Sequence, residues 1–436
     1  MKSLGLASVI LMTSTSLVAL GVSAGCSSSS NTNDADSGTI PPVTTDAATC
    51  GKLPATGPSV VVQPSTDPNT ETGRSVAFAL DGKGRPFFAY IQYATSTKGS
   101  LYADSWDDCA GAWRAPVVLD TAIVETESRS LSVSVDATDG RVGVAYAKTI
   151  PQTPQNPRIA AMLAISSDGG QTFGTPTEVS KKGSEDLNDV NNVRVALGGG
   201  KTFVAYNQTL AACKVTPQKC RDGSVLATLA GGAYTYEVVQ DGNTGDTGPY
   251  AVTRGLGIGL ALDSANVPAV VVQLDPPSGG NTTLAYWRPG GTTVAKIYDS
   301  ENAQNDDSDV SLAFDGTKPR IISRLQGTKV TADVYFSASN DGTTWSAKVP
   351  LTAPEHVTYS QNLVVSGGKV FAFCGGPHVF VSSDLTTFAL QDVGATVQTS
   401  GSVTGAVDSS GKFWVGLEGT VPTNDGKSGV TLFRQP

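Results

Sequence analysis

Apolar and polar residues alternate along most of this chain, in runs that come in pairs. The two runs of a pair are separated by a short turn rich in Gly, Asp and Ser. Alternation with a period of two, broken by such a turn, predicts a β-hairpin. Seven hairpins are predicted in this way, and their turn residues are Asp81, Asp136, Gly198, Asp263, Asp315, Ser366 and Asp408.

The predicted hairpins recur at a nearly regular spacing. Successive turn residues are separated by 55, 62, 65, 52, 51 and 42 residues, which leaves room for four short strands in each repeat. A hairpin repeated at such a period predicts a propeller or a solenoid, because one unit alone cannot bury its apolar face. The pattern therefore predicts an all-β fold, a seven-bladed β-propeller, with six blades as the alternative.

The seventh repeat has only three predicted strands before the chain ends at Pro436. The apolar run SVVVQP from Ser59 precedes the first hairpin at the same offset as the fourth strands of the other repeats. We expect this N-terminal strand to pair with residues Val430–Arg434 and to complete the last blade. Such closure removes strand edges that would otherwise pair with other chains.

The N-terminus has the pattern of an export signal. Lys2 precedes an apolar stretch from Leu4 to Leu20, and small residues then lead to Cys26. This segment resembles a bacterial lipoprotein signal, although Ser23 stands where Leu is usual. The resemblance implies that residues 1–25 are removed and that Cys26 is lipidated, whereas an ordinary secretory signal cleaved near Ala24 is the alternative.

The stretch after Cys26 is polar and contains Pro and many small residues, so it cannot bury enough apolar area to fold. We expect residues 26–56 to be a tether and residues 57–436 to be the propeller. Lipid anchoring would place the protein in the bacterial cell envelope, on the periplasmic or surface side of the outer membrane, with the membrane as its first partner.

Five cysteines remain after Cys26, which is consistent with an oxidising compartment. Cys213 and Cys220 bracket a short loop and are expected to form a local disulfide. Cys50 and Cys109 are expected to pair and to clamp the N-terminal segment to the first blade. Cys374 lies in the apolar run KVFAFC, which predicts a buried free thiol.

Net charge and residue types exclude several kinds of function. The net charge is −9, and no basic patch is present, so binding to a nucleic acid is not expected. The chain has only two histidines, His356 and His378, and no metal-binding spacing of Cys and His. The Gly-rich segment LGGGK at Leu197 lacks the spacing of a phosphate-binding loop. We therefore predict no cofactor and no structural metal.

A second motif recurs between the third and fourth strands of three repeats. SSDGGQTF at Ser166 matches the pattern S-x-D-x-G-x-T-[WF], SNDGTTW at Ser339 is one residue shorter, and SSDLTTF at Ser382 lacks the Gly. These segments resemble the Asp boxes, or BNR repeats, of sialidases and related propellers. The resemblance implies a structural turn on the face opposite the ligand, built by Ser166, Asp168, Gly170 and Phe173, by Ser339, Asp341 and Trp345, and by Ser382, Asp384 and Phe388.

The resemblance to sialidases does not extend to their catalytic residues. The F/Y-R-I-P motif that carries the first arginine of that family is absent, and the family usually has six blades. We therefore expect a surface-anchored propeller that binds a glycan or a protein without catalysis. The alternatives are a divergent glycoside hydrolase or lyase of the sialidase-like group and a structural role in the envelope, and the sequence assigns no catalytic residue.

Residues near the start of each innermost strand are candidates for the ligand-binding mouth. The ligand-binding candidates are Arg74, Arg129, Arg254, Tyr359, Glu127 and Asp309, with Glu125, Glu185 and Asp186 as further acids. Arginines near one mouth would bind a carboxylate or sulfate, and two nearby acids would suit glycoside hydrolysis. The alternative is that these arginines form salt bridges between blades. Asn305, Asp307 and Asp309 resemble the start of a calcium loop but lack its Gly and distal Glu, so a charged turn is expected there.

Overall fold

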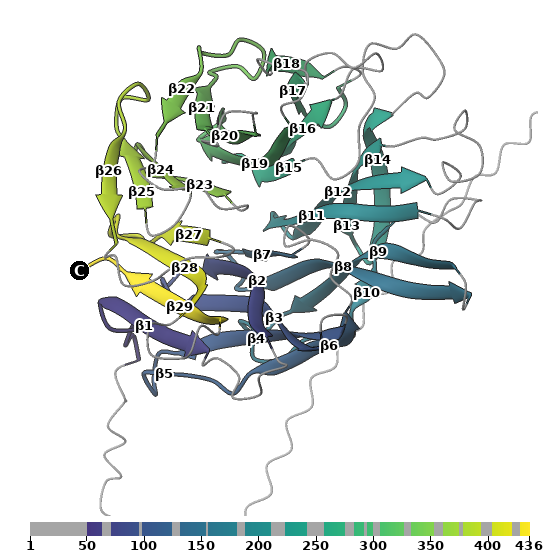
Figure 1. Cartoon of the computed structure of the whole chain (residues 1–436), viewed down its shortest axis with the longest axis vertical. Coiled ribbons are helices and arrows are strands. Elements are labelled where there is room, and N and C mark those ends of the chain that lie inside the picture. Colours follow the sequence, from purple (N-terminus) through teal and green to yellow (C-terminus); the bar gives the residue numbers. More distant parts are fainter. Residues whose placement is uncertain are drawn as a thin grey trace, which may run out of the picture. The chain divides into compact units, whose positions relative to one another are not determined.

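The computed structural model describes residues 50–62, 71–95, 98–123, 131–153, 156–180, 188–210, 223–241, 257–274, 283–291, 294–299, 306–326, 333–352, 361–374, 378–393, 403–420 and 428–436. All regular elements in these ranges are β-strands, and they include no helix able to span a membrane. The strands form seven antiparallel sheets arranged as the blades of a propeller (Figure 1). The seven-bladed prediction is thus confirmed, and the six-bladed alternative is wrong.

Each blade contributes an innermost strand, and these strands contact one another in sequence order around the ring, with the last contacting the first. The innermost strands of blades 1 to 7 are β2 Glu71–Leu80, β7 Leu131–Val135, β11 Asn188–Gly198, β15 Ile258–Leu262, β19 Asp306–Asp315, β23 Gln361–Ser366 and β27 Val403–Val407. The second strands are β3 Pro86–Thr95, β8 Val142–Thr153, β12 Lys201–Leu210, β16 Pro268–Leu274, β20 Lys318–Gln326, β24 Lys369–Cys374 and β28 Phe413–Thr420.

The outer strands complete the blades. The third strands are β4 Lys98–Asp107, β9 Asn156–Ser166, β13 Gly223–Ala230, β17 Thr283–Trp287, β21 Asp333–Ala338, β25 His378–Ser382 and β29 Ser428–Arg434. The fourth strands are β6 Val117–Ile123, β10 Thr177–Glu178, β14 Ala233–Asp241, β18 Ala295–Asp299, β22 Val349–Leu351, β26 Ala389–Asp392 and β1 Gly57–Val62. Blade 1 also has a two-residue strand, β5 Ala112–Trp113, which pairs with β4.

The antiparallel order of the strands gives every blade two distinct ends. The turns from strand one to strand two and from strand three to strand four lie at one end, which we call the turn end. The innermost strands start, and the second strands finish, at the opposite end, which we call the mouth end. This division places the predicted structural turns at the turn end, and the backbones of Arg74 in β2 and Asp309 in β19 near the mouth end.

The N-terminal strand closes the ring as predicted. β1 pairs antiparallel with β29, so that Gly57 lies opposite Arg434 and Ser59 lies opposite Leu432. The Arg434 Nη1 atom also donates a hydrogen bond to the carbonyl oxygen of Pro54 at 2.8 Å. Blade 7 is therefore built from both ends of the described chain.

The segment before β1, residues 50–56, is tied to blade 1 at the turn end. Cys50 and Cys109 form a disulfide, as predicted. The backbone N–H groups of Gly51 and Lys52 donate to the Asp108 carbonyl oxygen at 3.2 and 3.0 Å, and Trp106 Nε1 donates to the Lys52 carbonyl oxygen at 2.7 Å. We call residues 50–56 the strap. Cys374 is buried and free, whereas the predicted Cys213–Cys220 pair lies outside the described residues.

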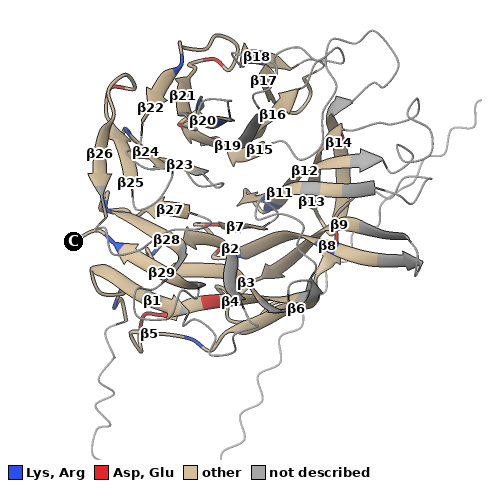
Figure 2. Ribbon diagram, viewed as in Figure 1, with Lys and Arg blue, Asp and Glu red and all other residues tan. Residues whose placement is uncertain are grey.

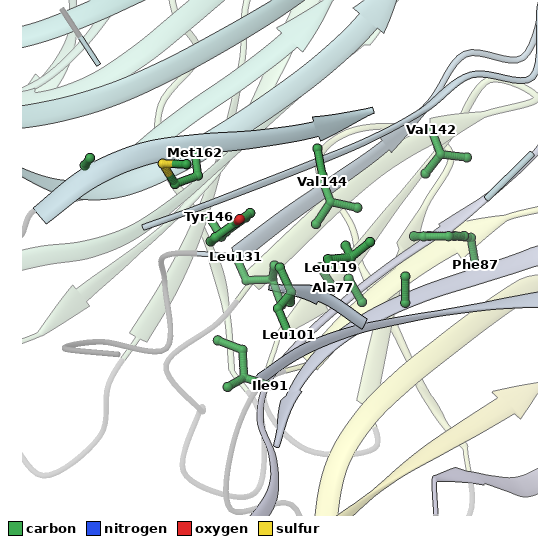
Figure 3. Packing of buried hydrophobic residues seen from close by; sticks show 14 residues of the cluster. Ala77, Phe87, Ile91, Leu101, Leu119, Leu131, Val142, Val144, Tyr146 and Met162 are labelled. Carbon is green, nitrogen blue, oxygen red and sulfur yellow. The ribbon is translucent and has the colours of Figure 1, made fainter. Parts of the chain in front are cut away.

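Apolar side chains from neighbouring blades pack between the sheets. In β3, Phe87 and Ile91 face blade 2, while Phe88 and Tyr90 face blade 7, because successive residues of a strand point to opposite sides. Figure 3 shows the first of these interfaces. Phe87 and Ile91 belong there to the same apolar cluster as Val144 and Tyr146 of blade 2. Most of the strand length carries no charge (Figure 2), as expected for sheets covered on both faces.

The acidic segment at the start of β19 differs from the expected charged turn. Asp306 and Asp307 are strand residues that pair with Gln326 and Leu325, and the register shifts before Val310. Pairing with the long strand β20 extends the strand into this segment, although charged residues are uncommon in strands.

Candidate functional site

The turn end contains aspartates that hold the inner hairpins in shape. Asp81 Oδ1 accepts hydrogen bonds from the backbone N–H groups of Lys83 at 2.9 Å and Arg85 at 2.8 Å, and its Oδ2 binds Arg85 Nε at 2.6 Å. Equivalent bonds join Asp263 to the backbone of Val267 and to Arg288 Nη1 at 2.7 Å. Burial alone would raise the pKa of Asp263, but these hydrogen bonds outweigh it and lower the pKa. These carboxylates therefore stabilise their own turns through hydrogen bonds and ion pairs.

Internal hydrogen bonds stabilise the turns that start at Ser166, Ser339 and Ser382, which we call the Ser–Asp turns. Ser166 Oγ donates to Asp168 Oδ1 at 2.7 Å, and Asp168 also accepts from the Thr172 backbone at 2.9 Å and the Thr172 hydroxyl at 2.6 Å. Although partial burial opposes ionisation, these bonds lower the pKa of Asp168 to about 2. Backbone N–H groups likewise lower the pKa values of Asp341 and Asp384.

The aromatic residue of each Ser–Asp turn lies against the preceding blade. Phe173 packs on Phe87 with ring centroids 6.0 Å apart, Trp345 on Tyr286 at 5.6 Å, and Phe388 on Phe336 at 5.0 Å. The ring contacts and the internal hydrogen bonds give these turns a structural role between blades.

The turns approach their neighbours so closely that two positions require glycine. A Cβ atom at Gly170 would lie 2.5 Å from Phe87, and one at Gly342 would lie 2.7 Å from Tyr286. Leu385 takes the corresponding place in the third turn and has the same left-handed backbone, with φ of 65°.

A narrow cleft at the turn end between blades 1 and 2 does not have the properties of a ligand site. The space in this cleft that water-sized spheres can occupy is about 30 Å³, which suits one or two water molecules. Its arginines are already paired, because Arg85 binds Asp81 and Asp108, and Arg114 binds Asp107 at 2.9 Å. Asp107, Asp108 and Cys109 offer clustered ligand atoms for a metal, but the sulfur is in the disulfide and both carboxylates bind arginine. These residues hold the strap.

Most mouth residues predicted from the sequence lie outside the described residues. These are Arg129, Arg254, Tyr359, Glu127, Glu125, Glu185 and Asp186. The backbone of Arg74 lies in β2 and that of Asp309 in β19, both near the mouth end of an innermost strand. Their predicted role in ligand binding stays a prediction.

β-Bulges or other irregularities of register interrupt three innermost strands near the mouth end. The register of β2 shifts between Thr72 and Val76, and that of β19 shifts between Asp307 and Val310, so these shifts span Arg74 and Asp309. In β11 the shift falls between Asn191 and Val193, and Asn192 there has a left-handed φ of 51°. Bulges are frequent beside active and binding sites, where they redirect side chains. The backbone is thus irregular where the sequence predicts a ligand.

Buried polar side chains also gather at the mouth end of blades 3 and 4. Ser224 Oγ donates to Asn207 Oδ1 at 2.7 Å, and both residues face blade 4. At the corresponding end of blade 4, the buried Thr283 donates from Oγ1 to Oδ1 of Asp299, an exposed residue, at 2.6 Å. Hydrogen-bonded pairs of this kind make the mouth-side margin of the blades polar.

Sequence reasoning missed two further residues at this end, Gln273 and His378. Gln273 is 1% exposed and His378 is 7% exposed, and none of their side-chain polar atoms has a hydrogen-bond partner among the described residues. A buried polar group without a partner is unusual and needs an explanation. The sequence feature that could have identified them is a polar residue within a strand whose other residues are mostly apolar and buried, as in PAVVVQL and HVFVS.

Comparison with known proteins concerns the fold. No known family model matches the sequence, and no curated protein is similar to it. A polysaccharide lyase of family PL25, an ulvan lyase, superposes with a TM-score of 0.50 at 8% identity, over 84% of this chain and 94% of the lyase.

Two further structures have lower scores. An α-L-arabinofuranosidase from Fusarium graminearum has a TM-score of 0.49 at 10% identity and covers 87% of this chain and 97% of its own. The sialidase of Trypanosoma rangeli has a TM-score of 0.42 at 16% identity, and the match covers 88% of this chain and 59% of the sialidase. Structurally similar proteins thus include glycosidase, sialidase and lyase propellers, and at these identities the likeness is one of fold.

Proposed function

We propose that the protein is a lipid-anchored envelope lipoprotein whose propeller binds a glycan at its mouth without catalysing a reaction. The observation that carries this proposal is the position of the β-bulges, which interrupt innermost strands at Arg74 and Asp309. An irregular backbone at the mouth and regular, internally bonded turns at the other end favour the mouth as the binding face. Catalysis is not part of the proposal because the sequence lacks the sialidase arginine motif.

The path of the chain is consistent with this arrangement. The strap and the first residue pair of the closing strand, Gly57 with Arg434, lie at the turn end. The described chain therefore enters the propeller at the end opposite the mouth, and the strap does not cover the mouth.

The binding proposal predicts that Arg74 and Arg129 contribute most of the affinity for an acidic glycan. Charge-assisted hydrogen bonds to a carboxylate or sulfate contribute about 1.5–3 kcal/mol each, so Arg74→Ala and Arg129→Ala should each weaken binding about ten- to a hundredfold. Lys should restore little, because it lacks the planar fork of donors. The measurement is a glycan-array screen with the purified full chain, followed by calorimetry on the glycans that bind.

Arg114→Ala is the matched control, because Arg114 lies at the turn end and is paired with Asp107. This variant should bind as the wild type does. Absence of any glycan ligand would refute the proposal, and so would turnover of an aryl sialoside or an acidic polysaccharide that is lost on mutating Glu125, Glu127, Glu185 or Asp309. That second result would establish the divergent hydrolase or lyase instead.

The anchoring proposal has its own test. Cys26→Ala should move the protein from the membrane fraction to the soluble fraction or leave the signal uncut, because no thioether-linked lipid can form. Intact mass of the wild-type protein should show an acylated residue 26 at the N-terminus. An unmodified mature N-terminus would contradict lipidation.

A further inference from the structure

The mouth-side margin of the interface between blades 5 and 6 contains three polar side chains, Arg324, Cys374 and His378. Arg324 lies on the same face of β20 as Ile322, and Ile322 packs in the cluster that contains Cys374 and Phe380. His378 lies on the same face of β25 as Phe380, because residues two apart in a strand point to the same side. All three side chains therefore face the same interface, with Cys374 inside its apolar cluster and Arg324 and His378 beyond the cluster on the mouth side.

His378 and Arg324 can both donate hydrogen bonds to a ligand. Neither Nδ1 nor Nε2 of His378 has a hydrogen-bond partner among the described residues, although only 7% of the residue is exposed. Arg324 is 6% exposed and has a protein contact of its own, but a guanidinium carries five N–H donors and can bind more than one group. Burial raises the pKa of the Cys374 thiol, so this neighbour adds no negative charge.

We propose that Arg324 and His378 form a subsite for an acidic sugar, in which the guanidinium binds the carboxylate or sulfate and the imidazole binds an adjacent hydroxyl. Arg presents paired donors that match the geometry of such an anion. A ring nitrogen of an imidazole can form a hydrogen bond with a sugar hydroxyl, which both donates and accepts. The inference rests on the proposed glycan binding and extends it to residues of blades 5 and 6.

The negative net charge of the protein means that an acidic ligand needs a positive group at the site itself. With a net charge of −9, the chain repels an acidic ligand at long range. Binding then depends on a fixed positive group held at short range in a site with little water. Arg324 meets this condition because it is buried and permanently charged.

The histidines provide a direct test on the unmodified protein. Only His356 and His378 are present, so imidazole ¹H–¹⁵N NMR spectra of the full chain contain signals from two side chains, and His356→Gln assigns them. The probes are sodium glucuronate, glucose 6-sulfate and glucose, titrated into the millimolar range where single-sugar binding is measurable. We expect glucuronate, glucose 6-sulfate or both to shift the His378 signals saturably, and glucose to leave them unchanged.

The choice between the two charged probes identifies the anion as a carboxylate or a sulfate. His378 signals that respond to neither probe would overturn the proposal, and an equal response to glucose would overturn the acidic character of the ligand. Because these spectra need no substitution at the site itself, a variant that fails to fold cannot obscure the result.

Variants of blade 5 test the role of the arginine. Arg324→Gln should weaken binding of the responding probe about tenfold or more, because a charge-assisted pair is lost. Arg320→Lys is the matched control, since Arg320 lies on the same face of the same strand, at the turn end, where it binds Asp315 and the Ser339 carbonyl oxygen. The control should bind the probe as the wild type does.

The same variants separate this inference from the proposed function. If Arg74→Ala abolishes glycan binding while Arg324→Gln and His378→Asn bind normally, the mouth binds a glycan and the proposed subsite is wrong. If the wild-type chain binds no glycan and no probe, the proposed function itself fails. If both sets of variants lose affinity, the ligand spans the mouth from blade 1 to blade 6.

Discussion

Deletion of residues 58–63 is expected to destabilise the propeller by several kcal/mol and to make it aggregate. The deletion removes β1, whose pairing with Thr431 and Leu432 completes the last blade. With about 1 kcal/mol for each lost backbone hydrogen bond, the free energy of unfolding should fall by roughly 3–5 kcal/mol. The exposed edge of β29 is then open to pairing with a second chain. Thermal unfolding and light scattering measure the two effects.

The matched control is a deletion of six residues from the polar stretch 30–48, which shortens the chain by the same length but keeps β1. This control should unfold at the wild-type temperature and keep the oligomeric state of the wild type. If the 58–63 deletion is equally stable and monomeric, the closing strand does not hold the ring together.

Replacement of Asp104 by Asn is expected to stabilise the protein at neutral pH. Asp104 is 3% exposed, its Cα is paired with that of Phe88, and its Oδ1 has no hydrogen-bond partner among the described residues. Burial raises its pKa from 3.8 to about 6, so the folded state prefers the neutral carboxyl. The stability that this preference supplies is complete below about pH 4 and is lost as the pH rises through about 6.

A difference of about two pKa units corresponds to about 2–3 kcal/mol. Asp104→Asn should therefore exceed the wild-type free energy of unfolding by about 2 kcal/mol at pH 7.5 and match it near pH 4. Chemical denaturation at both values of pH measures the difference. An equal effect of the substitution at both values would show that Asp104 does not titrate between them.

Asp168→Asn provides a comparison of opposite sign. Hydrogen bonds lower the pKa of Asp168 to about 2, so its stabilising effect is present above about pH 4 and is lost as the pH falls towards 2. Asp168→Asn should thus be less stable than the wild type at neutral pH, with a difference that disappears in acid.

The periodicity of the sequence predicted the blades because period-two alternation and Asp or Gly turns are local properties. The position of β1 was also predictable, since an apolar run at the offset of a fourth strand has only one blade left to complete. The additional strand β5 of blade 1, which pairs with β4, was not predicted. β5 depends on Trp113 packing against Trp106 and Phe88, contacts that no local pattern reveals.

The candidate site was predictable only in part. Asn305, Asp307 and Asp309 suggested a charged turn, but within this segment Asp307 pairs with Leu325 and is a strand residue. Gln273 and His378 resemble other polar residues within the predicted strands. They differ from those residues only in their positions at the mouth ends of β16 and β25. Those places follow from the register of each blade and from the order of the ring, so sequence reasoning about single strands could not single them out.

The strap has a mechanical consequence for an anchored protein. A pull on the chain before Cys50 enters blade 1 through the disulfide to Cys109, and the strap, which is hydrogen-bonded to blade 1, separates that bond from Gly57. The covalent link therefore bears the load, and the hydrogen bonds between β1 and β29 remain unloaded. Without the disulfide, the same pull would peel β1 away from its Gly57–Arg434 end, one residue pair after another. The disulfide thus separates the force on the anchor from the strand that closes the ring.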